Sequence, residues 1–240
     1  MCKLKINCDL GEGFDEIDTL IMPWLSYANI ACGGHAGDEQ SMRDTIQLAL
    51  REINSGRELQ IGAHPSYPDK VNFGRISFSI TKEILADSLI QQITHLIKIA
   101  SELGVKVSYI KPHGALYNDF YTSKTAQSAL LLVADFFALP LMVQALPVPV
   151  FEQFFVQEKS HLPFIYEVFI DRAYKENGFL VPRSEDGSVF YAKYEIEKRI
   201  KNLLNGGLFS QNGKWLNLSF HSACFHSDTP NSAAMIGCIK

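Results

Sequence analysis

The chain has 240 residues, of which 47% are hydrophobic and 20% charged; this is the composition of a globular protein with a sizeable core and excludes extensive disorder. Its formal net charge of −4 argues against nucleic acid as the main partner, because proteins that bind nucleic acid usually carry a basic surface. No run approaches the roughly 20 apolar residues of a membrane span, and the first residues lack the apolar core of a signal peptide.

Seven apolar runs of strand length recur along the chain, and each is followed by a polar cluster rich in Gly, His, Asp or Pro. The runs are Leu4–Cys8, Tyr27–Cys32, Leu59–Ala63, Val105–Ile110, Leu139–Ala145, Phe164–Ile170 and Leu216–Cys224. Several of the segments between them have the i, i+3, i+4 apolar spacing of amphipathic helices. These segments are Ser41–Ile53, Thr81–Gly104, Ser123–Phe137 and Tyr194–Leu204.

Strands that alternate with helices predict a parallel sheet, whose strand ends all lie on one side. We therefore expect residues 1–240 to form a single (β/α) barrel of seven strands, with a doubly wound open sheet as the alternative. In either fold the polar clusters gather at the carboxyl ends of the strands, which is where active sites form.

The first two clusters carry carboxylates and a histidine among glycines. Asp9 and Glu12 in DLGEG could serve as metal ligands, as a general base or as an anchor for a substrate amine. The alternative is a purely structural role as a helix cap. In NIACGGHAGD, Asn29 lies near the strand end and His35 and Asp38 are three residues apart. The glycines there allow close backbone approach to a ligand, and the His–Asp pair suits metal binding or a carboxylate-oriented imidazole.

The third and fourth clusters add two further histidines and a lysine. His64 opens HPSYPD, where prolines stiffen the loop, and Lys111, His113 and Asn118 lie in KPHGALYN. Lys111 and His113 are two apart, so on a regular strand they share one face. A lysine at a barrel mouth must pair with a carboxylate or a substrate anion, because burying it unpaired is costly.

The later clusters supply acids and arginines. Glu167 and Asp171 share one face of an otherwise apolar run, which predicts a site or an ion pair with Lys111. Arg172 follows directly, and Arg183 in FLVPRS could hold a carboxylate or phosphate.

The last cluster, FHSDTP, repeats a histidine followed by an acid, at His226 and Asp228. The five cysteines are scattered and odd in number, which favours reduced thiols in a cytoplasmic protein over disulfides. Three of them end strands, where small buried thiols are common, so a catalytic cysteine is disfavoured. The chain has no P-loop, dinucleotide-binding or HExxH motif.

Taken together, these motifs resemble the LamB/YcsF family in order and over almost the full length. They are NCDLGEGF at 7–14, ANIACGGHAGD at 28–38, GAHPSYPD at 62–69, KPHGALYN at 111–118, EVFIDRAY at 167–174, LVPRS at 180–184 and FHSDTP at 225–230. The chain departs from the family pattern at Gly34, Glu39 and Ser227, which affects substrate fit and local packing more than chemistry.

The resemblance implies a seven-stranded (β/α) barrel, distantly like polysaccharide deacetylases, and ATP-dependent opening of 5-oxo-L-proline to L-glutamate with two further subunits, B and C. ATP is then a co-substrate, expected with Mg²⁺. On this interpretation the catalytic residues are Asp9, Glu12, His64, Lys111, His113 and Asp171. The substrate-binding residues are Asn29, His35, Asp38, Asn118, Glu167, Arg172, Arg183, His226 and Asp228.

Two other functions remain compatible with the sequence. A metal-dependent amide or ester hydrolase of the deacetylase type would use Asp9, His35, His64 and His113 as ligands. A non-catalytic subunit could instead carry a small acid to its partners.

Overall fold

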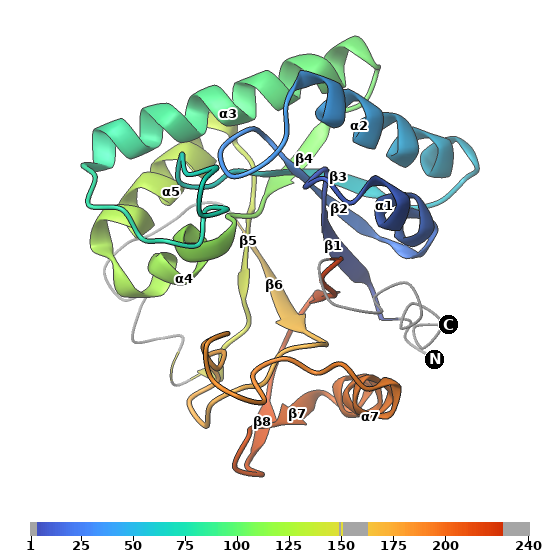
Figure 1. Ribbon diagram of the computed structural model, residues 1–240, viewed down its shortest axis with the longest axis vertical. Helices are drawn as coiled ribbons and strands as arrows, with labels where there is room; N and C mark the ends of the chain where they lie inside the picture. Colours follow the sequence, from blue (N-terminus) through green and yellow to red (C-terminus); the bar gives the residue numbers. More distant parts are fainter. Residues whose placement is uncertain (1–3, 149, 151–162, 228–240) are drawn as a thin grey trace.

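The computed structural model describes residues 4–148, 150 and 163–227. Within these residues, parallel strands close into a barrel in the order β1-β2-β3-β4-β5-β6-β9 (Figure 1). The strands are β1 Ile6–Leu10, β2 Tyr27–Ala31, β3 Gln60–His64, β4 Val107–Ile110, β5 Leu141–Gln144, β6 Phe164–Phe169 and β9 Ser222–Cys224. The predicted barrel is confirmed, and the open-sheet alternative is wrong because β9 pairs with both β1 and β6.

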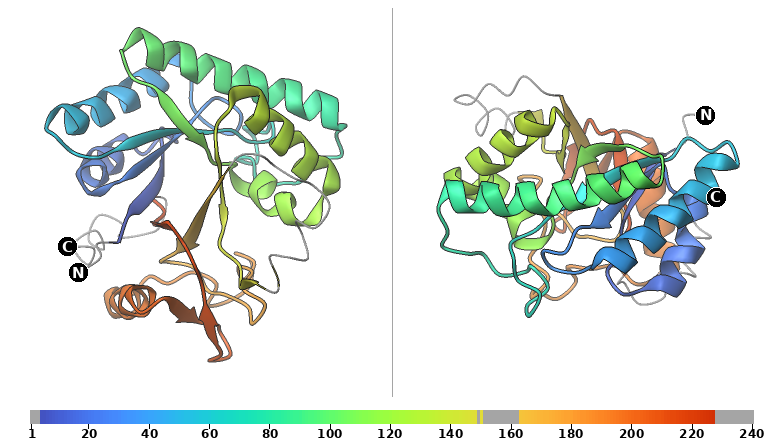
Figure 2. Two further views of the ribbon diagram at one scale, coloured as in Figure 1. Left: turned by 180° about the vertical axis from the view of Figure 1, so that it is seen from behind. Right: turned by 90° about the horizontal axis from the view of Figure 1, so that it is seen from above.

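Helices follow most of the strands and cover the outside of the barrel, as the views in Figure 2 show for α2 and α3. They are α1 Asp15–Ile21, a 3₁₀ turn at Met22–Trp24, α2 Glu39–Asn54, α3 Lys82–Glu102, α4 Gly114–Thr122, α5 Lys124–Phe137 and α7 Lys193–Leu204. The four helices predicted from spacing are all present, with ends within two residues of the expected positions.

Helix α3 forms where its sequence predicts it. The Thr81 side chain accepts a hydrogen bond from the backbone of Ile84 at its start. Gly104 follows its end with φ +75°, a conformation that glycine adopts without strain. The predicted apolar stripe is buried at Leu85, Leu89, Ile93 and Leu96. Ile84, expected on the same stripe, is 59% exposed instead, because it lies in the first turn, at the edge of the buried face.

The last predicted strand, Leu216–Cys224, is wrong as a single element. Its first part belongs to an antiparallel hairpin formed by β7 Gly207–Phe209 and β8 Trp215–Asn217. Only Ser222–Cys224 enters the barrel, as β9. The apolar pattern runs through both pieces, so it could not reveal the turn between them.

The inside of the barrel carries buried polar side chains from several strands. Asn7 and Asp9 lie two apart on β1, and their side chains meet those of Asn29 from β2 and Glu167 from β6. All four are buried, and the apolar core lies mainly between the barrel and its helices. Among the described residues, no helix combines the length and apolarity needed to cross a membrane.

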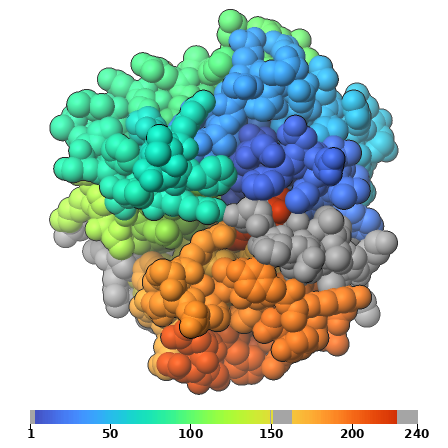
Figure 3. Space-filling model, viewed as in Figure 1, coloured from blue at the N-terminus to red at the C-terminus, as the bar shows by residue number. Residues whose placement is uncertain are grey.

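The segments that follow the strands meet on one face of the molecule. In Figure 3, the teal loop after β3 lies beside the dark blue segment after β1, and the orange segment after β6 lies below them. These are the segments in which the sequence places its polar clusters.

Candidate active site

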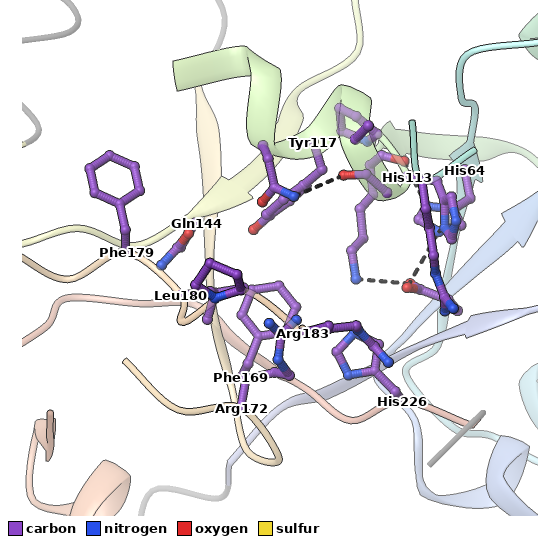
Figure 4. Close-up of a pocket in the computed structure, with 18 of the residues that line it drawn as sticks. His64, His113, Tyr117, Gln144, Phe169, Arg172, Phe179, Leu180, Arg183 and His226 are labelled. Carbon is purple, nitrogen blue, oxygen red and sulfur yellow. Dashed lines mark hydrogen bonds and ion pairs between the residues drawn. The ribbon is translucent and has the colours of Figure 1, made fainter. Parts of the chain in front are cut away.

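A cavity of about 530 Å³ lies where the carboxyl ends of the barrel strands meet (Figure 4). Its lining includes nine of the fifteen residues predicted from sequence: Asp9, Glu12, His64, Lys111, His113, Asn118, Arg172, Arg183 and His226. Figure 4 shows His64 and His113 towards one end and Gln144 and Phe179 towards the other. One cavity therefore brings together residues from both halves of the chain.

Lys111 lies at the inner wall of this cavity and is 2% exposed. Its Nζ donates a hydrogen bond to Asp9 Oδ1 at 2.8 Å and lies 3.2 Å from Glu167 Oε2. It also lies 3.2 Å from Asn7 Oδ1 and 3.3 Å from Cys224 Sγ. The ion pair expected between Lys111 and Glu167 is present, and Asp9 forms a second one.

These contacts keep both Lys111 and Asp9 charged. Burial alone would lower the pKa of Lys111, but the carboxylates of Asp9 and Glu167 raise it well above its usual range. Burial alone would raise the pKa of Asp9, but His64 and Lys111 hold it well below its usual range. The wall of the cavity thus carries a fixed ammonium group beside a fixed carboxylate.

Two amides and a phenol hold this charged group in place. Asn29 donates to Asp9 Oδ1 at 2.8 Å and to Asn7 Oδ1 at 2.9 Å, and it accepts from the Tyr109 hydroxyl at 2.6 Å. Asn7 in turn donates to Glu167 at 3.0 Å. Asn29 is fully buried and does not line the cavity, so it orients Asp9 from behind.

Three imidazoles and one carboxylate form a cluster beside the lysine, which we call the imidazole cluster: Glu12, His35, His64 and His113. His35 Nε2 lies 2.7 Å from Glu12 Oε1, and His64 Nε2 lies 3.0 Å from His113 Nδ1. The rings of His35 and His113 stack, with centroids 3.6 Å apart and 1° between their planes. His64 is also 3.3 Å from Asp9, which joins the cluster to the Lys111 group.

The backbone brings these histidines together through a close contact between two loops. Ala115 donates its amide hydrogen to the carbonyl of Gly74 at 2.9 Å. Gly74 and Gly114 both have positive φ, and a Cβ on Gly114 would meet the Gly74 carbonyl oxygen at 2.5 Å. Only glycine permits this approach, which sets His113 against His35 and His64.

The environment gives the three imidazoles different charge states. Burial and the neighbouring His64 lower the pKa of His35 to about 2. Burial, with His35 and His64, also lowers the pKa of His113 well below its usual range. Burial opposes protonation of His64 too, but Asp9 and Glu12 raise its pKa above the usual value. His35 and His113 are therefore neutral at pH 7.

Among the residues that the structure describes, two groups of side chains have donor atoms close enough to share a metal ion. One is the imidazole cluster, and the other is formed by Asp9, Cys224 and His226. In the second group, Lys111 Nζ already lies 2.8 Å from Asp9 and 3.3 Å from Cys224, so an ammonium group fills that position.

Asp171 and His226 form a further pair at the cavity. His226 Nδ1 lies 2.9 Å from Asp171 Oδ1, and Asp171 is fully buried. His226 lines the cavity, whereas Asp171 does not, so the carboxylate orients the imidazole that faces the ligand space.

The two predicted arginines both line the cavity, and one of them supports the segment that carries the other. Arg172 is buried and donates to the carbonyls of Val181 at 2.6 Å and Ser188 at 3.3 Å. Burial and the neighbouring Arg183 lower its pKa to about 10. Arg172 thus braces the 181–188 segment, which carries Arg183 to the cavity.

The remaining predicted residues lie farther from the chemistry. Asp38 caps α2 by accepting from the Ser41 backbone amide at 2.9 Å and is not part of the cavity lining. Asn118 lines the cavity and donates to the Gly114 carbonyl at 3.3 Å. Asp228 lies outside the described residues.

The described cysteines are buried free thiols. Burial raises the pKa of Cys8, Cys32 and Cys224 well above the usual value, so none of them supplies a thiolate at neutral pH.

Sequence reasoning missed several residues of the site. Tyr117, Gln144 and Phe169 line the cavity, and the side chain of Asn7 accepts a hydrogen bond from Lys111 inside the barrel. Asn7 could have been found from its spacing, because it lies two residues before Asp9 and so shares its face of β1. Gln144 could also have been predicted, because it is a polar residue at the carboxyl end of an otherwise apolar strand.

Comparison with known proteins gives consistent matches over almost the whole chain. The model of the LamB/YcsF family matches residues 4–240. The A subunit of 5-oxoprolinase from Vibrio cholerae serotype O1 is 35% identical, and the match covers 99% of this chain and 96% of that protein. The protein of the same name from Pyrococcus abyssi is 36% identical, with 99% and 92% covered.

A solved structure has the same fold. The crystal structure of the lactam utilization protein from Thermus thermophilus matches with a TM-score of 0.85 and 30% sequence identity. The match covers 99% of this chain and 94% of that one.

Proposed function

The chain belongs to the LamB/YcsF family, and on this premise we propose that it is the A component of a 5-oxoprolinase, which opens 5-oxo-L-proline to L-glutamate at the expense of ATP. The names of the relatives from Vibrio cholerae and Pyrococcus abyssi support the activity. Because those names describe one component of an enzyme, they also support an assembly with partner chains, here B and C. The enzyme would act in the cytoplasm with ATP as its Mg²⁺ complex.

The observation that carries this proposal is the buried Lys111 between Asp9 and Glu167, beside the imidazole cluster and open to a cavity. A fixed cation next to acid–base groups suits a reaction in which negative charge develops on an oxygen. The cavity also carries the guanidinium groups of Arg75 and Arg183, which suits a small substrate with a carboxylate.

ATP is needed because the amide of a lactam is stabilised by resonance. Transfer of the γ-phosphoryl group to the lactam oxygen, with loss of the N–H proton, would give ADP and an electrophilic carbon. Water would add to that carbon, and the C–N bond would then break as the nitrogen takes up a proton. The resulting acyl phosphate and a second water would give glutamate and phosphate.

Each charged residue has a role in this scheme. Lys111 would offset negative charge on the reacting oxygen, and Arg183 would bind the substrate carboxylate or a phosphate. The imidazole cluster, next to Asp9, would take the proton from the attacking water, and His226 with Asp171 would deliver a proton to the ring nitrogen.

The test is turnover of ATP and 5-oxoproline by the chain with and without its partners B and C, with glutamate and phosphate measured together. Lys111→Ala and His113→Ala should each reduce glutamate formation by at least ~100-fold. Arg183→Ala should mainly raise KM for 5-oxoproline. His95→Ala, on the exposed side of α3, is the matched control and should leave turnover unchanged.

Two outcomes would refute the proposal. Near-normal glutamate formation by the Lys111 variant would remove Lys111 from the reaction. Binding of 5-oxoproline by the complete assembly without any turnover would make the chain a carrier instead.

A further inference from the structure

Three donor atoms of the imidazole cluster, from Glu12, His64 and His113, have the spacing of a metal site. His64 Nε2 and His113 Nδ1 are 3.0 Å apart. Glu12 Oε1 lies 3.3 Å from His113 Nδ1 and 3.7 Å from His64 Nε2. Bonds of about 2.0–2.1 Å in a tetrahedral zinc site place neighbouring ligand atoms ~3.3 Å apart, in the middle of these values.

The outward-facing nitrogens fix which atoms point into the cluster. His64 Nδ1 lies 2.7 Å from the carbonyl oxygen of Lys111, and His113 Nε2 lies 3.0 Å from that of Phe73. A carbonyl only accepts hydrogen bonds, so each of these nitrogens carries the ring hydrogen. When both rings are neutral, His64 Nε2 and His113 Nδ1 therefore face each other with lone pairs and no hydrogen between them.

Two lone pairs at 3.0 Å require a positive species between or beside them. A proton shared by the two rings is one solution, and a metal ion bound by both is the other. The hydrogen bonds to backbone carbonyls favour the metal ion, because metal-binding histidines characteristically donate their second ring hydrogen in this way. His35 is not a further ligand, because its ring stacks in parallel on that of His113 at 3.6 Å, and an ion in the plane of one ring lies outside the plane of the other. Its Nε2 instead lies 2.7 Å from Glu12 Oε1 and orients that carboxylate.

The cluster is buried on one side and open on the other. His35, His64 and His113 are 2%, 1% and 6% exposed, yet Glu12, His64 and His113 line the cavity. An ion held there would be shielded from bulk water and would face the ligand space. That arrangement leaves room for a water or a substrate oxygen as a further ligand, as in catalytic rather than purely structural zinc sites.

We propose that Glu12, His64 and His113 bind one divalent transition-metal ion, with zinc the best match to two imidazoles and a carboxylate. This site does not depend on the proposed 5-oxoprolinase activity and can be tested without it. With the ion bound, His64 and His113 would use their lone pairs as ligands, and the ion would take over their role as base by making an adjacent water more acidic.

The experiment uses the full chain without an affinity tag. The protein is stripped with a chelator, dialysed against zinc and then against metal-free buffer, and its zinc content is measured by mass spectrometry. In parallel, cobalt is titrated into the stripped protein and visible absorption is followed. We expect one zinc per chain and the intense visible bands of four-coordinate cobalt.

Variants identify the ligands. His64→Gln and His113→Gln should each weaken metal binding by about 10–100-fold or more, whereas the exposed His95→Gln should bind as the wild type does. Because a variant could fail to fold, melting temperature is measured for each with and without zinc. Zinc should raise it for the wild type and His95→Gln, and much less for the two cluster variants.

The proposal is overturned if the wild-type chain retains no zinc and shows no cobalt bands, in which case a shared proton joins His64 and His113. It is equally overturned if zinc binds but folded His64→Gln and His113→Gln retain it as tightly as the wild type. Loss of zinc without loss of glutamate formation would leave the 5-oxoprolinase proposal standing, so the two can fail separately.

Discussion

Replacing Lys111 with methionine tests whether this lysine stabilises the fold as well as the reaction. Methionine keeps most of the length of the side chain and removes its charge. The buried carboxylates of Asp9 and Glu167, now 2.8 and 3.2 Å from the ammonium group, would lose their common counterion. At an effective dielectric constant of about 20, these two contacts correspond to gross attractions of about 6 and about 5 kcal/mol.

The net effect is smaller, because burying the lysine costs hydration and because Asp9 keeps His64 at 3.3 Å. Removing one partner from a buried ion pair typically costs about 3–5 kcal/mol. We expect Lys111→Met to lower the free energy of unfolding by that amount, a large part of the ~5–15 kcal/mol usual for a protein. Urea unfolding followed by circular dichroism measures it, and the exposed Lys98→Met is the control.

A second substitution separates charge from packing. Glu167→Gln added to Lys111→Met removes the carboxylate that lost its partner, so the double variant should recover part of the lost stability without recovering glutamate formation. A stabilising role of Lys111 is refuted if Lys111→Met unfolds at the same urea concentration as the wild type, or if adding Glu167→Gln destabilises it further.

Two further substitutions test buried residues that do not line the cavity. Burial, assisted by Glu12 and Asp15, raises the pKa of Asp18 from its usual 3.8 to about 7, so its contribution to stability is complete below about pH 4 and is lost as the pH rises through 7. As the pH rises from 5 to 8, the free energy of unfolding of Asp18→Asn should therefore increase by ~2–3 kcal/mol relative to that of the wild type, as measured by urea unfolding. The same pH dependence in both proteins would contradict this. A Cβ on Gly62 would overlap the ring of Tyr109, so Gly62→Ala should lower stability by about 1–3 kcal/mol, and an unchanged melting temperature would show that the ring can move.

Local patterns in the sequence determined most of the fold. Helix α3 is an example, because its cap at Thr81 and its end at Gly104 are local signals that act as expected, and its apolar stripe is buried apart from Ile84 in the first turn. The alternation of strands and helices likewise determined a parallel sheet with polar clusters at one end. Pattern failed at Leu216, where one apolar run serves two different sheets, since the pattern does not record which strands each half will pair with.

For the site, the sequence identified residue types and the tertiary structure decided their partners. The charge of Lys111 predicted a nearby buried anion, but the sequence offers several carboxylates. Closure of the barrel brings those of Asp9 and Glu167 to the lysine. The imidazole cluster depends on contacts between loops after different strands, which spacing along one chain does not encode. Asp38 and His35 lie three residues apart, yet one caps a helix at the surface and the other stacks on His113 inside the protein. The sequence determines the chemistry of each side chain, whereas the distances between residues far apart in the chain are fixed only when the barrel closes.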